Sequence, residues 1–214
     1  MNKTRFLIAI LSVFLLQSQA QSQSTEPPKF EVAAEFTTLE REAFPGRTEP
    51  GFGARFTFNL NRMVSFETAG YFFPRDCIDC RNNGTVTEVL GGVKIGKRFE
   101  HWGIFGKARP GVVSFGRGKF SVIPNPSNPG FPFQFIPERL NSFATDVGGV
   151  VEFYPSKRLV TRFDAGDTII HFGSRPADVF IFNPATGTSS PLRITLPSRI
   201  THNFQFMASV GFRF

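Results

Sequence analysis

The sequence has very little cysteine, histidine, tryptophan or tyrosine, and these shortages exclude several kinds of functional site. The 214 residues include 2 Cys, 3 His, 1 Trp and 2 Tyr. A zinc centre needs four ligands, and no further cysteine or histidine lies near Cys77 and Cys80 in the sequence. A thioredoxin-type site places its CxxC motif in a strand–helix–strand unit, which this chain lacks. We therefore expect no metal and no cofactor.

A long apolar run is also missing, and this excludes a transmembrane helix. The longest run, Phe6–Leu16, is shorter than the roughly 20 residues that such a helix needs. It follows a short basic segment at residues 2–5 and precedes the triplet Ser-Gln-Ala at residues 18–20. These are the parts of a secretory signal peptide, with cleavage expected after residue 20. No cysteine follows the run, so a lipoprotein anchor is not indicated.

The exported part of the chain begins with a polar stretch, residues 21–29, which we interpret as a periplasmic lead-in. An exported protein meets an oxidising compartment, where close cysteine pairs form disulfides. We therefore interpret Cys77 and Cys80 as a small disulfide in a surface loop.

Clustered positive charge and phosphate-binding glycine loops are absent as well. The formal net charge is +7, but the lysines and arginines form no stripe, so nucleic acid is not an expected partner. The glycine pairs at 91–92 and 148–149 lie inside predicted strands, where glycine usually marks a bend or close packing.

The abundant residue is phenylalanine, with 28 copies, and it is spaced singly along alternating segments. In the closing stretch, residues 203–214 (NFQFMASVGFRF), every second residue back from Phe214 is apolar and the others are small or polar. This period of two predicts a strand with one apolar and one wet face. A soluble protein would normally protect such an edge strand, whereas a closed barrel in lipid has no edge.

Seven earlier segments alternate in the same way, which makes eight predicted strands. Connections after the second, fourth and sixth strands are short, and the other four are long. This alternation is typical of transmembrane barrels with short periplasmic turns and longer extracellular loops. A soluble lipocalin has an apolar interior instead. The expected strands are 30–36, 52–60, 64–72, 85–99, 102–115, 142–154, 159–172 and 203–214, and the expected outer loops are Arg41–Pro50, Pro74–Gly84, Gly116–Leu140 and Gly173–Ser198.

The fold class predicted from this pattern is all-β: an eight-stranded antiparallel up-and-down transmembrane β-barrel spanning residues 30–214. The polar strand faces carry charges of both signs, which the alternation assigns to the lumen. An eight-stranded barrel is only wide enough for side chains to fill it, so these charges must be paired or hydrogen-bonded. The lumen charges are Glu31, Glu35, Arg55, Glu67, Glu88, Lys94, Arg98, Lys107, Arg109, Asp146, Glu152, Arg162, Asp164 and Arg213.

Hairpin symmetry and barrel closure suggest partners for these charges. The expected pairs are Arg55 with Glu67, Glu152 with Arg162, and Glu31 with Arg213. The hairpin of the fourth and fifth strands carries an excess of basic residues on its lumen face. We expect these basic residues to form ion pairs with Glu67 on one side and with Asp146 or Glu152 on the other. Its basic residues are Lys94, Arg98, Lys107 and Arg109. We favour a structural ion-pair plug over a selectivity lining.

Two polar residues, Asp167 and His171, fall on the lipid-facing phase of their strand. Either a bulge or emergence into the headgroup region would explain them.

The C-terminal residues carry a resemblance to a known family. Phe212 and Phe214, with the alternating residues before them, look like the signal that outer-membrane barrels present to the barrel-assembly machinery. With the signal peptide and eight strands, the chain resembles the OmpA/OmpX-like family of small outer-membrane β-barrels. Residues 105–111, 146–155 and 211–214 are also similar to outer-membrane barrel domains of environmental Gram-negative bacteria.

The resemblance implies a monomer in the bacterial outer membrane. Its implied partners are outer-membrane lipid, lipopolysaccharide, periplasmic chaperones, the assembly machinery and an extracellular partner of the loops. The role that we expect is structural or surface interaction through the loops, and the alternative is a narrow, low-conductance pore. Some eight-stranded barrels modify lipid A with a His-x-Ser pair, but His171 and Ser174 have the wrong spacing to share a strand face. We therefore predict no enzyme activity.

Overall fold

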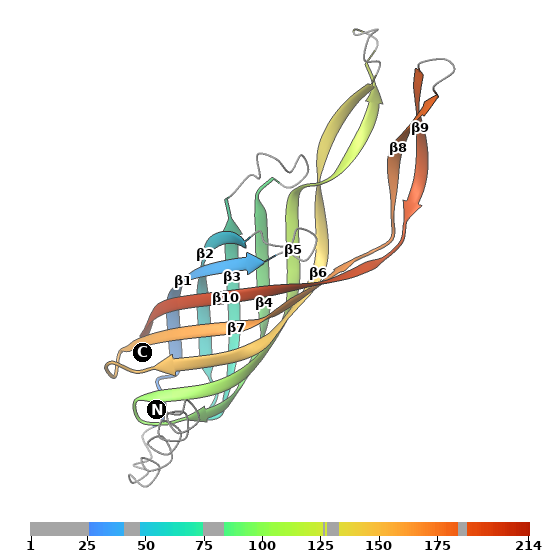
Figure 1. Ribbon diagram of the computed structural model, residues 1–214. Helices are drawn as coiled ribbons and strands as arrows, with labels where there is room; N and C mark the ends of the chain where they lie inside the picture. The colour runs from blue at the N-terminus through green and yellow to red at the C-terminus, as the bar shows by residue number, and fades with distance from the viewer. Residues whose placement is uncertain (1–25, 41–47, 75–83, 126, 128–132, 184–187) are drawn as a thin grey trace, which may run out of the picture.

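The computed structural model of the chain describes residues 26–40, 48–74, 84–125, 127, 133–183 and 188–214. Eight of the described strands form a closed ring in the order β1-β10-β7-β6-β5-β4-β3-β2 (Figure 1). Every neighbouring pair in the ring is antiparallel. The predicted eight-stranded antiparallel barrel is confirmed. The expected signal peptide, residues 1–20, and the Cys77–Cys80 pair lie outside the described residues.

The barrel strands are close to the alternating segments of the sequence, and β7 has the bounds that the alternation predicts. Most of the others extend further at the end of the barrel away from the C-terminus. Their bounds are β1 Phe30–Glu40, β2 Thr48–Asn59, β3 Val64–Phe73, β4 Val86–Arg98, β5 Trp102–Pro124, β6 Phe133–Phe153, β7 Leu159–Phe172 and β10 Arg199–Arg213. Among the described residues, no helix is long and apolar enough to cross a membrane.

The last strand closes the ring against the first. The Phe30 amide donates to the Phe214 carbonyl at 2.9 Å, and the Phe214 amide donates to the Phe30 carbonyl at the same distance. Nine further residue pairs continue this ladder from Glu31 opposite Arg213 to Leu39 opposite Gln205. The aromatic C-terminal strand therefore leaves no free sheet edge in the ring, which is what a hydrocarbon environment demands.

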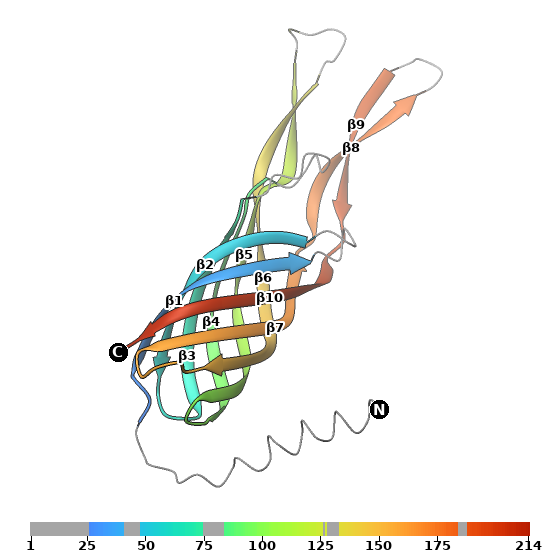
Figure 2. The ribbon, with the colours of Figure 1, turned by 60° about the vertical axis from the view of Figure 1, so that its left-hand side comes forward.

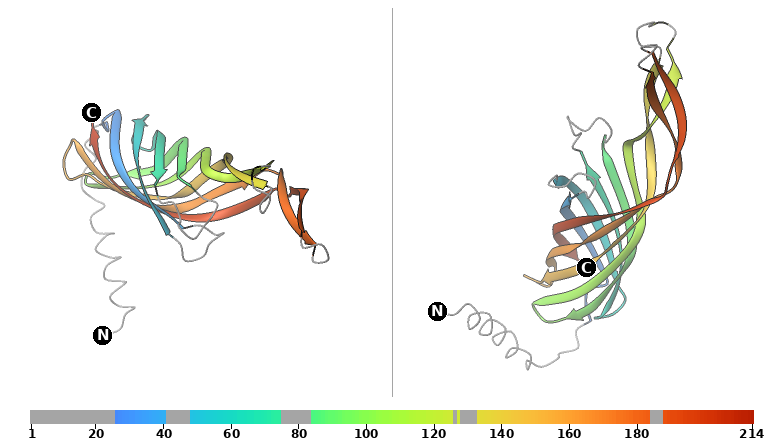
Figure 3. Two further views of the ribbon diagram at one scale, coloured as in Figure 1. Left: turned by 90° about the horizontal axis from the view of Figure 1, so that it is seen from above. Right: turned by 45° about the vertical axis from the view of Figure 1, so that its right-hand side comes forward.

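Two of the predicted outer loops are in fact β-hairpins, so the loop predictions for Gly116–Leu140 and Gly173–Ser198 are wrong. Strands β5 and β6 remain paired beyond the barrel as far as Pro124 opposite Phe133, after a register shift between Phe115 and Lys119. The second segment contains β8 (Arg175–Asn183) and β9 (Thr188–Leu196), paired with each other. Both hairpins project from one end of the barrel, and the C-terminus lies at the other end (Figures 1 and 2). Figure 3 shows the same arrangement from two further sides.

The outer surface of the ring is apolar on every strand. Side chains alternate between the two faces of a strand, and most of the residues that face outward are apolar. Each barrel strand leaves a large apolar side chain about half exposed, although a soluble protein would bury such residues. One example from each strand, in chain order, is Phe36, Phe52, Phe66, Val89, Ile104, Phe143, Phe163 and Phe204. An apolar exterior around a charged interior is the arrangement of a barrel that spans a membrane.

Candidate functional site

The interior of the barrel collects the charged residues that the alternation assigned to the lumen, and all of them are buried. Glu67 on β3 is the centre of this network, with an exposed fraction of 1%. Its carboxylate accepts hydrogen bonds from Arg162 Nη1 at 2.5 Å and Nη2 at 3.1 Å. Lys94 Nζ lies 3.4 Å away, Arg55 Nη1 3.6 Å and Arg109 Nη1 4.0 Å. One carboxylate therefore holds cations from β2, β4, β5 and β7 together.

A second centre is formed by two aspartates. Asp146 on β6 accepts from Arg109 Nε at 2.8 Å and Nη2 at 2.6 Å, which is a two-point contact. Lys107 Nζ lies 2.9 Å from Asp146 and 3.1 Å from Asp164, so it joins the two acids. Asp164 also binds Arg162 Nε at 2.5 Å, and this links the second centre to the first.

The end of the lumen nearest the C-terminus carries the remaining pairs. Glu31 lies opposite Arg213 across the closing strands, with Arg213 Nε 3.3 Å from its carboxylate. Arg98 Nη2 lies 3.6 Å from Glu31 and 3.5 Å from Glu152, and Lys94 Nζ also contacts Glu152. The four basic residues of the β4–β5 hairpin thus meet acids of strands on both sides.

The two ion pairs expected within hairpins, Glu152 with Arg162 and Arg55 with Glu67, differ from each other in geometry. Glu152 stands directly opposite Arg162 in the β6–β7 register, with 3.6 Å between Oε1 and Nη1. Arg55 and Glu67 are diagonal neighbours, because Thr57 is the residue opposite Glu67. The nearer acid for Arg55 is Glu35, whose carboxylate accepts from Arg55 Nε at 2.8 Å.

An apolar layer closes the end of the lumen nearest the hairpins, and sequence reasoning missed it. Side chains from seven of the eight barrel strands, including Met207 on β10, pack there with almost no exposure. The signal that could have revealed this layer is the run of apolar residues on the lumen phase near the strand ends. Its members are Leu39, Ala69, Tyr71, Phe73, Val86, Leu90, Val113, Phe115, Ala144, Ile170 and Met207, with Leu140 and Phe172 packed against them.

A few residues at the boundary between the charged network and the apolar layer are held by hydrogen bonds. The Tyr71 hydroxyl donates to Glu35 Oε2 at 2.5 Å and accepts from Arg109 Nη1 at 3.3 Å. Glu88 accepts from Gln205 Nε2 at 3.0 Å. Among the described residues, Glu88 is the one lumen acid that has no ion pair. The described lumen is therefore filled along its length, first by charge pairs and then by apolar side chains.

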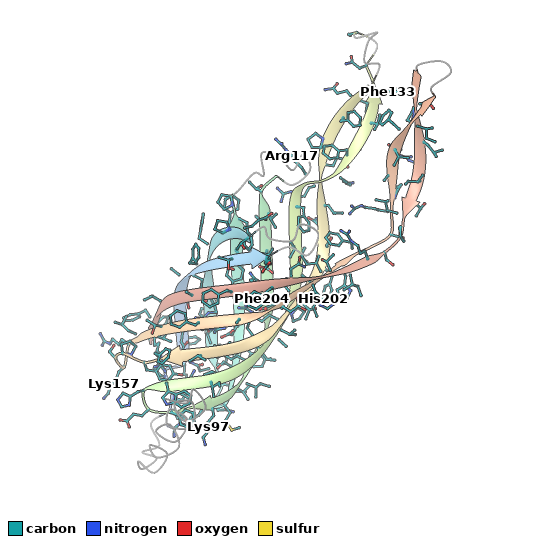
Figure 4. All side chains as sticks on the ribbon, in the orientation of Figure 1. Lys97, Arg117, Phe133, Lys157, His202 and Phe204 are labelled. Atoms are coloured by element: carbon teal, nitrogen blue, oxygen red, sulfur yellow. The ribbon has the colours of Figure 1, made fainter. Side chains whose placement is uncertain are left out.

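On the outside of the barrel, Asp167 of β7 contacts His202 and Asn203 of β10. His202 Nδ1 lies 2.6 Å from Asp167 Oδ2, and the Asn203 amide donates to Asp167 Oδ1 at 2.8 Å. Figure 4 shows His202 and Phe204 on β10, between the hairpin end and the turn end marked by Lys157. Pairing of β7 continues without a register shift on both sides, so the bulge explanation for Asp167 is wrong. Emergence into the headgroup region remains our prediction.

The residues considered for enzyme or metal chemistry do not come together. His171 packs its ring against Phe143 on the barrel exterior, with 5.7 Å between centroids. Ser174 lies beyond the end of β7 and is exposed. Within the described part of the chain, no group of three or more His, Cys, Asp or Glu side chains could hold a metal ion.

The two projecting hairpins contact each other through aromatic rings. Phe180 on β8 lies 5.2 Å, between ring centroids, from both Phe133 and Phe135 on β6. Aromatic pairs at this separation contribute favourably beyond the area that they bury. The hairpins therefore form a joint surface beyond the barrel.

Comparisons with known proteins found several similar solved structures. The structure is similar to Neisserial surface protein A, with 10% identity, a TM-score of 0.46 and coverage of 86% of this chain and 96% of that one. The N-terminal β-barrel domain of Pseudomonas aeruginosa OprF matches with 10% identity, a TM-score of 0.43 and coverage of 89% and 100%. Ail of Yersinia pestis, in complex with the heparin analogue sucrose octasulfate, matches with 11% identity, a TM-score of 0.45 and coverage of 88% and 99%. No protein-family model and no curated protein matches the chain.

Proposed function

We propose that the chain is an outer-membrane protein whose barrel is a closed anchor and whose two projecting hairpins carry out surface interaction. The observation that carries this proposal is the filled lumen. An ion-conducting lumen needs a continuous wet path, but here the charges pair with one another and an apolar layer covers them. In the part of the chain that the structure describes, the pair of hairpins is therefore what remains to contact a partner.

The location that we propose follows from the same physical features. The apolar exterior requires lipid, and a closed β-barrel satisfies its backbone hydrogen bonds without water. Bacterial outer-membrane barrels keep short turns on the periplasmic side and long connections outside. By this rule, the hairpins face the environment, and the turns at residues 60–63, 99–101 and 154–158 face the periplasm.

The anchor part of the proposal is tested by single-channel recording of the refolded protein in a planar bilayer. A closed anchor is silent at potentials up to 100 mV. Arg55→Ala and Glu67→Ala remove members of the buried network, so these variants should leak or lose stability. Steady openings of the wild type, with an ion selectivity that shifts in the two variants, would overturn the closed anchor. They would support the narrow pore instead.

The orientation is tested by labelling whole cells with a membrane-impermeant maleimide. In a background with Cys77→Ser and Cys80→Ser, the variant Ser190→Cys places a thiol on β9 at an exposed position. The matched variant Ser156→Cys places it in the exposed turn at the opposite end. We expect Ser190→Cys to label on intact cells and Ser156→Cys to label only after permeabilisation. The reverse pattern, or equal labelling of both, would contradict the orientation.

A further inference from the structure

A groove of about 360 Å³ lies between the extension of the β5–β6 hairpin and the start of the β8–β9 hairpin. Its walls carry Lys119 on β5, Glu138 and Arg139 on β6, Arg175 and Asp178 on β8, and Arg193 on β9. Leu140, which packs against the apolar layer of the lumen, contributes to the lining. The groove thus combines four cationic side chains with an apolar patch.

Two of these cations are already neutralised. Lys119 Nζ lies 2.6 Å from Glu138, and Arg193 Nε lies 3.2 Å from Asp178. Arg139 and Arg175 have no carboxylate partner among the described residues. The Arg139 guanidinium donates a hydrogen bond to the Ser114 hydroxyl at 3.0 Å. Because a hydroxyl is neutral, this bond does not compensate the positive charge of Arg139. The groove therefore has an excess of two positive charges.

Arg175 is the unusual member of the group. Its Nη1 atom is buried and has no hydrogen-bond partner in the described part of the chain. Its guanidinium lies 6.0 Å from the centre of the Phe172 ring, and the Arg199 guanidinium lies 5.4 Å from the same ring. Burial and the neighbouring Arg199 together lower the pKa of Arg175. A buried, unsatisfied donor next to a like charge is costly unless an acceptor is bound to it.

We propose that this groove binds a phosphate group, with Arg175 and Arg139 as its principal ligands. Arginine guanidinium groups donate paired, charge-assisted hydrogen bonds to phosphate oxygens. The unpaired charges of the two arginines and the free Nη1 donor match the charge and the acceptor oxygens of such a group. This inference rests on the proposed function, because it assumes that the hairpins are the extracellular interaction surface.

The groove lies close to the expected membrane surface. Phe143 is the last large apolar residue on the outward face of β6 before the hairpin, and Asn141 and Arg139 follow it on the same face. At about 3.3 Å per residue, Arg139 is roughly 13 Å beyond Phe143 along the strand. Phosphate groups occur both in lipid headgroups and on soluble molecules, and both could reach this position.

The test measures binding of two probes to the refolded protein in phosphatidylcholine nanodiscs at low and at physiological ionic strength. Inositol hexakisphosphate is the soluble probe, and lipid A incorporated at a low fraction into the nanodisc is the lipid probe. Arg175→Gln removes the half-buried charge, and Arg158→Gln removes an equal charge from the exposed turn at the opposite end. Glu138→Gln releases Lys119 from its carboxylate and makes the groove more basic.

The expected result is a loss of about tenfold in affinity for Arg175→Gln, since one charge-assisted contact is removed. Arg158→Gln should bind like the wild type, and Glu138→Gln should bind more tightly. All of these affinities should fall with added salt. Lipid A binding alone would assign the groove to a membrane headgroup, and binding of the soluble probe alone would assign it to a soluble phosphate-bearing ligand.

The proposal is overturned if Arg175→Gln and Arg158→Gln bind both probes as the wild type does, or if the wild type binds neither. A thermal melt of Arg175→Gln controls for folding, and we expect no loss because Nη1 has no partner to lose. Failure of the closed anchor is separable, because it would be seen as conductance and would not change the ranking of these variants.

Discussion

Removal of the Glu67 carboxylate tests whether the lumen is a dry ion-pair plug. In Glu67→Ala, Arg162 loses a two-point contact of 2.5 and 3.1 Å, and Lys94 and Arg55 lose an anion within 3.6 Å. Loss of one partner from a buried pair costs about 3–5 kcal/mol, because a desolvated charge is left behind. Arg162 keeps Asp164 at 2.5 Å, so we expect the lower part of that range.

The measurement is reversible urea unfolding of the protein in lipid vesicles, followed by the gel mobility of unboiled samples and by far-UV circular dichroism. Glu67→Gln keeps the volume and one acceptor oxygen, so its loss of stability should be smaller than that of Glu67→Ala. Glu138→Gln is the matched control, because it breaks an ion pair whose side chains are 45% and 38% exposed. Exposed pairs contribute little, and we expect no change in the midpoint.

A double-mutant cycle makes the reasoning sharper. Glu67→Gln combined with Arg162→Met removes both charges of the closest contact. The free energy of unfolding of the double variant should therefore fall by less than the sum of the falls in the two single variants. The expected coupling is about 0.5–3 kcal/mol. An unchanged midpoint for Glu67→Ala would refute the dry plug, because it would mean that water replaces the carboxylate at no cost.

Three further predictions concern backbone packing, the hydrogen bonds at the turn end of the lumen, and the hairpins. Gly148→Ala should lower the urea midpoint, because its Cβ would lie 2.4 Å from the Ala165 carbonyl oxygen. The control is Gly149→Ala, whose Cβ meets nothing within 4 Å and should leave the midpoint unchanged. Equal midpoints for the two variants would contradict the packing argument. Tyr154→Phe removes a buried hydroxyl that bridges an arginine at 2.9 Å and a glutamate at 2.8 Å. It should cost about 1.5–3 kcal/mol in the same assay, and a neutral result would mean that water takes over the bridge. Phe180→Ser removes the ring that joins the two hairpins, so proteolysis of the hairpins should become faster while the barrel midpoint stays constant; unchanged cleavage would mean that the rings do not hold the hairpins together.

Strand alternation alone was enough to predict the barrel, because the environment of every second residue is fixed by the fold. The bounds of β7 and the burial of the lumen charges follow from that period of two. The partner of each charge is less accessible to such reasoning. Arg162 on β7 reaches Glu67 on β3 across the barrel, and no hairpin register contains this contact.

The two hairpins were missed because prolines in them look like loop signals. Pro137 lies within β6 and pairs with Phe120, and Pro176 and Pro191 lie within β8 and β9. A two-stranded ribbon has an outward hydrogen-bonding side on each strand, where proline costs no ladder bond. Beyond the membrane, both faces of a strand meet water, so the apolar alternation that marks a spanning strand is no longer required.

The distribution of charge separates the anchor from the interacting surface. The lumen charges comprise as many acids as bases, and nearly all of them are paired within the protein. A selectivity lining would instead present an excess of one sign to a permeating ion. The groove between the hairpins has that excess, with Arg139 and Arg175 unmatched by any described carboxylate. Charges inside the barrel are therefore compensated within the protein, and Arg139 and Arg175 outside it are the two that our proposal assigns to an anionic ligand.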